Sequence, residues 1–300
     1  MGQPRLLTQE VADRVAHLQV RASRAVDGLR SGIHRSPHRG ASVIFAEHRD
    51  YRPGDDMRLL DWRAYARNDR FTIKHFEQET HLRAHLLLDR SASMDYDGGA
   101  TDTHKGEYGA ALLSALGLVL ARQGDAVGAA VFADSVAEQL PARARTDHLD
   151  SILELLSRPP EPGLGTDLGG VLAELSHNVG RRGFVAIASD LLDFGERPLQ
   201  PLKQLTALGH EVLVLHVMHP DELELPFREP MRFEDPESDE SLDADPVTVR
   251  SGYMDELGKF MEKCRRRCTS AGCRYTLART DMPIQQVLAQ ALLSAGSRWG

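Results

Sequence analysis

Short apolar runs alternate with longer segments of helical periodicity over most of the chain after residue 80. Four short runs predict strands, and the first of them, 86–88, is apolar on both faces, as in the middle of a parallel sheet; the runs cover 86–88, 126–132, 184–188 and 212–216. Between them apolar residues recur every three or four positions, which predicts helices over 104–122, 148–156, 171–178 and 199–208. This alternation predicts an α/β fold with a doubly wound, mostly parallel sheet flanked by helices.

The remaining segments predict additions to this sheet. We expect an antiparallel partner strand at 135–140, a helix at 253–271, a strand at 273–277 and a helix at 284–293. Residues 227–249 are rich in acidic side chains and poor in apolar ones, which predicts a charged β-hairpin or a flexible flap. The expected organisation is an N-terminal helical arm (1–35), a small β/turn module (36–79) and an α/β domain (80–300) with an acidic hairpin insertion (226–250).

The charge of the chain argues against nucleic acid as its main partner. The formal net charge is -8 over 300 residues, whereas a nucleic-acid surface is basic on balance. One segment, 49–70, interleaves arginines with Trp62 and Tyr65 and could stack on bases. Aspartates match those arginines closely, so we favour an internal network of salt bridges for this segment.

The cysteine content predicts a reducing compartment. The only cysteines are Cys264, Cys268 and Cys273, and an odd, sparse set without a secretory leader favours a cytoplasmic protein. No run approaches the roughly 20 apolar residues of a membrane span, so none is expected. Cys264 and Cys268 lie one helical turn apart and could hold a metal, but packed or surface thiols are the favoured interpretation, because no Cys/His pattern accompanies them.

Three predicted loops carry hard oxygen groups. Asp89, Ser91 and Ser93 follow the apolar run 86–88, and residues two apart in an extended segment point the same way. Thr166 lies in a glycine-rich loop, and Asp190 follows the run 184–188. Loops at the carboxyl edge of one sheet bring such groups together, and their oxygens suit Mg²⁺ or Mn²⁺. The alternative is that they cap turns and helices.

The order of these groups resembles the metal-ion-dependent adhesion site of von Willebrand factor A domains. The match assigns Asp89, Ser91 and Ser93 to the first loop, Thr166 to the second and Asp190 to the third.

A narrower resemblance covers most of the chain. The stretch 51–56 (YRPGDD), Asp61-Trp62 and Ala66-Arg67 resemble the bacterial family called domain of unknown function 58. That resemblance implies a partnership with a MoxR-type AAA+ ATPase in assembling or activating other proteins.

These observations favour a binding module over an enzyme. Two aspartates and three neutral hydroxyls would leave a divalent ion with residual positive charge, so an acidic residue of a partner or client could complete its coordination. One alternative is a magnesium-dependent phosphotransferase with Asp89 as nucleophile. Phosphatases of the haloacid-dehalogenase type carry a second aspartate two residues on; here that position is Ser91, which cannot transfer the proton. Another alternative is a metal-free structural scaffold.

Overall fold

The computed structural model describes residues 22, 43–50, 72–78, 82–98, 104–159, 165–180, 182–238 and 240–293. The chain forms two compact units, Met1–His34 with Leu82–Gly300, and Arg35–His81. The second unit contains an antiparallel hairpin of β1 (Val43–Asp50) and β2 (Thr72–Gln78). The expected module 36–79 falls within this unit. The Arg/Asp-rich segment with Trp62 and Tyr65, and all but one residue of the expected N-terminal arm, lie outside the described residues.

A six-stranded sheet forms the centre of the larger unit. Its order is β10-β7-β6-β3-β4-β5, and all neighbours are parallel except β4 and β5. The strands are β3 (Arg83–Asp89), β4 (Ala126–Phe132), β5 (Val136–Arg143), β6 (Phe184–Ser189), β7 (Glu211–Met218) and β10 (Arg274–Arg279). The doubly wound sheet predicted from the sequence is confirmed.

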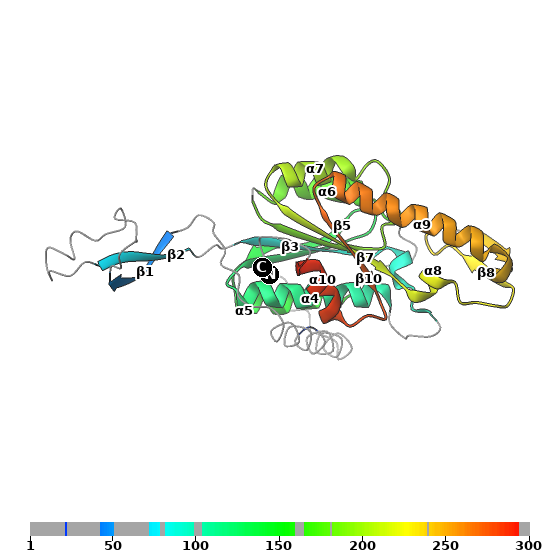
Figure 1. Cartoon of the computed structure of the whole chain (residues 1–300), viewed down its shortest axis with the longest axis horizontal. Helices are drawn as coiled ribbons and strands as arrows, with labels where there is room; N and C mark the ends of the chain where they lie inside the picture. Colours follow the sequence, from blue (N-terminus) through cyan, green and yellow to red (C-terminus); the bar gives the residue numbers. More distant parts are fainter. Residues whose placement is uncertain are drawn as a thin grey trace, which may run out of the picture. The chain divides into compact units, whose positions relative to one another are not determined.

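Helices cover both faces of this sheet (Figure 1). One face carries α4 (Lys105–Arg122), α5 (Thr146–Leu156) and α10 (Ile284–Leu293). The other carries α6 (Leu168–Asn178), α7 (Leu199–Ala207) and α9 (Pro246–Ser270). Each face encloses its own apolar cluster, which is why the central strands are apolar on both sides.

The close approach of β5 to β4 depends on a glycine. A Cβ on Gly128 would lie 2.6 Å from the backbone nitrogen of Ala142 and 2.7 Å from the carbonyl oxygen of Leu140. The strand register shifts at this point, between Val127 and Ala129. A side chain at position 128 would therefore push the edge strand away, because the atoms it would meet belong to the backbone of β5 and cannot rotate aside as a side chain can.

The acidic segment contains a short hairpin, β8 (Met231–Glu234) with β9 (Ser241–Ala244). The hairpin is thus the correct one of the two predicted alternatives. The predicted start of the next helix, residue 253, is wrong, because α9 begins at Pro246. The Asp245 side chain accepts a hydrogen bond from the Val247 nitrogen at 3.0 Å, and proline occupies the first helical position, where its missing N–H costs nothing. A further short helix, α8 (Pro220–Glu224), was not predicted from the sequence.

None of the described helices combines the length and apolar character that crossing a bilayer requires.

Candidate functional site

The strand order reverses between β3 and β6, and we call the carboxyl edge of these two strands the crevice. From β3 the chain continues to β4 and β5 on one side, then returns to β6 on the other side of β3. Open α/β sheets bind ligands at the carboxyl ends of strands on either side of such a reversal. β3 ends at Asp89 and β6 ends at Ser189, directly before Asp190. The two aspartates therefore leave neighbouring strands at one edge.

Asp89 is fully buried and held by two donors. Its Oδ1 accepts a hydrogen bond from the Ser91 nitrogen at 2.9 Å, and its Oδ2 accepts one from the Ser189 hydroxyl at 2.6 Å. Leu88 is paired with Ala188 in the register of β3 and β6, so Asp89 and Ser189 are the next neighbours across. The register of the sheet thus fixes the carboxylate.

The loop after Asp89 is turned rather than extended, which corrects the geometry predicted for it. Ser91 precedes a single 3-10 turn (Ala92–Asp95), and the Met94 nitrogen donates to the Ser91 carbonyl at 3.0 Å. The turn follows from burial, because it places the Met94 side chain in the core with no exposed surface. It still brings the two hydroxyls together: Ser91 Oγ and Ser93 Oγ are 3.1 Å apart.

Asp190 is paired with a lysine that sequence reasoning missed. Lys105, at the start of α4, donates from Nζ to Asp190 Oδ2 at 2.8 Å and to Glu222 Oε1 of α8 at 2.7 Å. The side chains of Lys105 and Asp190 are each only 1% exposed. A positive charge is therefore built into the wall of the crevice.

The two aspartates have different charge states for identifiable reasons. Burial, with the nearby charge of Asp190, raises the pKa of Asp89 to about 7, although hydrogen bonds from Ser189 and Ser91 oppose this. Burial alone would raise the pKa of Asp190 too, but the charge and hydrogen bond of Lys105 outweigh it and hold that pKa below its usual range. At neutral pH Asp190 is ionised, and Asp89 is close to its titration midpoint.

Thr166 lies at the same edge. The nitrogen of the next residue, Asp167, donates to the Ala133 carbonyl at 3.0 Å, which holds this loop beside the end of β4. Thr166 Oγ1 is buried and makes no hydrogen bond. The other four predicted residues are connected to one another: the Ser91 nitrogen bonds Asp89, the Ser91 and Ser93 hydroxyls are in contact, and Ser93 helps to lower the pKa of Asp190. The structure therefore joins four of the five predicted residues and leaves the hydroxyl oxygen of the fifth, Thr166, without a hydrogen bond.

This arrangement fits a hard divalent cation. Magnesium takes oxygen ligands at about 2.0–2.1 Å in octahedral geometry, so adjacent ligand oxygens lie about 3 Å apart. The Ser91–Ser93 oxygen separation of 3.1 Å matches that spacing, and a buried unpaired hydroxyl, as on Thr166, lacks the partner such groups normally have. The donor set contains two carboxylates. Among the described residues, no group of three or more His, Cys, Asp or Glu side chains is placed to hold a metal ion.

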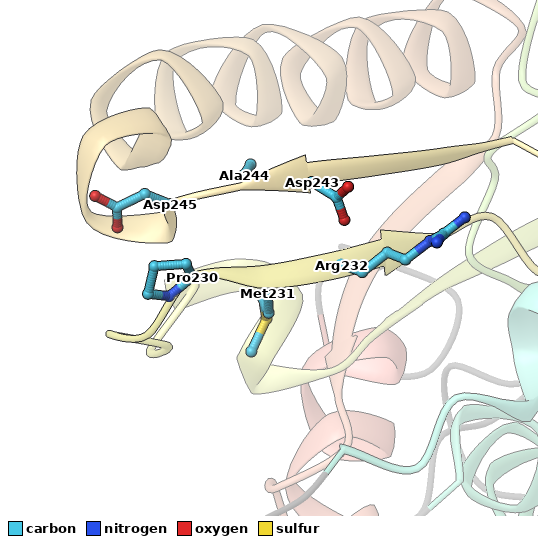
Figure 2. A pocket seen from close by; sticks show the side chains of 6 residues that line it. All are labelled: Pro230, Met231, Arg232, Asp243, Ala244 and Asp245. Carbon is cyan, nitrogen blue, oxygen red and sulfur yellow. The ribbon is translucent and has the colours of Figure 1, made fainter.

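Two other features of the described residues are weaker candidates for a functional site. An open groove of about 490 Å³ runs along the β8–β9 hairpin; its labelled side chains point in different directions (Figure 2). Its Arg232 already bonds Ser241, and its Asp245 caps α9. The cysteines at 264, 268 and 273 are free and buried, and burial raises the pKa of the Cys264 thiol to about 11. All three pack in the apolar cluster on the α6–α7–α9 face of the sheet.

The signals for the missed residues differ. Lys105 shares a helical face with the buried Tyr108 and Leu112, so its position in the apolar repeat marks it as a buried charge. Ser189 stands next to a predicted ligand, but only the strand register reveals its bond to Asp89. Glu222 lies in a five-residue helix, which is too short to leave a periodic pattern.

The mostly parallel sheet with its antiparallel edge strand and the helices on both faces form a von Willebrand factor A-like fold. More narrowly, residues 47–260 match the family described as "Protein of unknown function DUF58", and the chain belongs to that family.

The chain is also similar to individual relatives and solved structures. The chain is 28% identical to the uncharacterized protein Rv1480 of Mycobacterium tuberculosis over 91% of its own length and 86% of that protein. It is similar to the structure of an aerotolerance-related membrane protein from Bacteroides fragilis, with 22% identity, a TM-score of 0.47, and coverage of 71% and 99% of the two chains. It is also similar to the SpRpn10 VWA domain, with 9% identity, a TM-score of 0.40, and coverage of 70% and 95%.

The cytoplasmic location expected from the sequence is wrong. The similar structure from Bacteroides fragilis is that of a membrane protein, and another similar structure is that of a membrane spanning protein from Vibrio fischeri. The expectation rested largely on the sparse cysteines, and cysteine content alone does not determine where in the cell a protein is located.

Proposed function

We propose that this von Willebrand factor A-like chain is a metal-dependent protein-interaction module without enzymatic activity. Asp89, Ser91, Ser93, Thr166 and Asp190 would hold one Mg²⁺ or Mn²⁺ ion. The observation that carries the proposal is the unpaired buried Thr166 hydroxyl at the edge where Ser91 and Ser93 lie at the spacing of adjacent ligands.

The residues around the crevice support docking rather than catalysis. A bound divalent ion supplies a coordination position for an acidic side chain of another protein. Ser189 and the Ser91 nitrogen hold the Asp89 carboxylate in place. Ser91, two residues after Asp89, has no proton that it can release near neutral pH, so the acid/base partner that a phosphotransferase needs is missing at that position.

The proposed partner is a MoxR-type AAA+ ATPase, or a client that it remodels, and this part of the proposal rests on the family resemblance alone. The chemistry of the site adds one requirement, an exposed Asp or Glu on the partner. Because this chain is acidic overall, a shared metal ion would let two acidic surfaces meet where direct attraction fails.

The test is binding of the purified ATPase to the immobilised chain. We expect binding in Mg²⁺, reversible loss with chelator, and weaker binding by Ser91→Ala. The matched control is Ser251→Ala on the exposed part of α9, which should bind like the wild type. Binding that survives both chelator and Ser91→Ala would show that docking does not use the metal.

A phosphatase assay with a generic phosphate ester tests the absence of enzymatic activity. We expect no turnover with Mg²⁺. Magnesium-dependent hydrolysis that disappears in Asp89→Asn would instead support the phosphotransferase alternative.

A further inference from the structure

Lys105 is the one fully buried ammonium group in direct contact with the candidate site among the described residues. Lysine is rarely buried completely, because removing its charge from water costs several kcal/mol unless carboxylates compensate. Here two carboxylates do: Asp190 at 2.8 Å and Glu222 at 2.7 Å. A site proposed to bind a cation thus already contains one.

The lysine is fixed from both sides. Glu222 Oε2 accepts a hydrogen bond from the His219 nitrogen at 2.8 Å, and the Glu222 carbonyl accepts one from the Tyr253 hydroxyl at 2.6 Å. Gly106, the next residue of α4, is also tightly packed, since a Cβ there would lie 3.2 Å from the Met94 carbonyl oxygen. The ammonium group therefore has little freedom to leave Asp190 when another cation arrives.

The electrostatic consequence follows from the two buried aspartates. Asp89 and Asp190 face one crevice, and two carboxylates in a buried site repel each other. The Lys105 charge offsets Asp190 and lets the crevice exist without a metal ion. The same charge repels a divalent ion bound to the other side of the Asp190 carboxylate, over about 5 Å in a medium of low effective dielectric.

We infer that Lys105 is a resident counter-cation that keeps the metal site assembled when it is empty and weakens metal binding enough to make it reversible. This inference rests on the proposed metal site. It assigns Lys105 a positioning and tuning role, with Glu222 as the group that anchors it.

The test is Lys105→Met, which keeps the length of the side chain and removes its charge. Without metal, this variant should melt at a lower temperature than the wild type. Its dissociation constant for Mn²⁺, measured by calorimetry, should be at least about tenfold smaller, because the repulsion is gone. Lys105→Arg, which restores a positive charge, should return the affinity toward the wild-type value.

Glu222→Gln is the matched control. It breaks the other ion pair of Lys105 but keeps the cation, so it should bind Mn²⁺ no more tightly than the wild type. A merely structural role for Lys105 predicts that both variants lose stability and that neither gains affinity.

The outcomes separate this inference from the proposed function. Absence of Mn²⁺ binding by the wild type and by every variant would overturn both. Binding by the wild type with equal or weaker binding by Lys105→Met would overturn the inference and leave the metal site standing. Equal tightening in Glu222→Gln, or a Lys105→Met protein that stays unfolded even in Mn²⁺, would also overturn it, because bound metal should replace the lost charge.

Discussion

Replacing Asp89 with asparagine tests the charge balance of the crevice. Burial, with the charge of Asp190, raises the pKa of Asp89 from 3.8 to about 7 in the folded protein. Between these two values the folded protein holds a proton that the unfolded chain has released. The free energy of unfolding must therefore fall as pH rises through this window and level off above about pH 7. Asparagine cannot titrate, so this contribution vanishes in the variant.

The magnitude follows from the width of the window. Each pH unit over which one extra proton is bound changes the free energy of unfolding by about 1.4 kcal/mol. From pH 5 to pH 7 the wild type should lose about 2 kcal/mol relative to Asp89→Asn, because the proton is already half released at pH 7. Asp190 does not disturb this comparison, because its pKa lies below the usual value and it titrates outside the range. His216, whose pKa burial lowers to about 4, is present in both proteins, so to first order its effect cancels in the difference.

Urea unfolding in chelator, at half-unit steps from pH 5 to pH 8, measures this difference. We expect the gap between the two proteins to change in favour of Asp89→Asn as pH rises to about 7 and then to flatten towards pH 8, where the last of the proton is released. Any fixed offset reflects the altered hydrogen bonds of the amide and does not depend on pH. A gap that is flat from pH 5 to pH 8 would refute the assignment of a raised pKa to Asp89.

Two further predictions concern packing. Gly128→Ala should lower the free energy of unfolding by about 1–3 kcal/mol, because the new Cβ would lie 2.6 Å from the backbone of β5. Gly258→Ala, in α9 with nothing within 4 Å of its Cβ, should raise the free energy of unfolding by about 0.5–1 kcal/mol. Urea unfolding of both variants measures this contrast, and equal effects would contradict the geometry of the β4–β5 pair. The three buried cysteines are Cys264, Cys268 and Cys273. They should resist a thiol reagent in the native protein and all react in denaturant. Fast labelling of the native protein would contradict their burial.

The sheet was predictable because the sequence carries its signal locally. Strands such as β4 and β6 are buried at every position and consist almost entirely of apolar residues, and the helices between them keep a clear apolar period. The start of α9 was missed because its first two turns are mostly exposed, so no apolar repeat marks them. The Asp245-Pro246 pair was the usable signal, since it combines an N-cap with a first-turn proline.

Of the candidate site, only the five oxygen-bearing residues proposed to hold the metal could be predicted from the sequence. Asp89, Ser91, Ser93, Thr166 and Asp190 stand out as oxygen groups that follow apolar runs or a glycine-rich loop. The groups that set their charge state come from distant positions: Lys105 and Glu222 meet across 117 residues, and Ser189 meets Asp89 across 100 residues. Such contacts depend on strand order and register, which local periodicity does not encode.

The claim that three loops together hold one metal ion is tested most directly by titrating Mn²⁺ into the purified chain at pH 8 in a calorimeter. The wild type and the control Ser251→Ala should each bind one ion. Asp89→Ala should show no binding, and Thr166→Val should bind more weakly, since it removes the unpaired hydroxyl of the second loop. Equal titration curves for the wild type, Asp89→Ala and Thr166→Val would show that the ion, if bound at all, is held somewhere else.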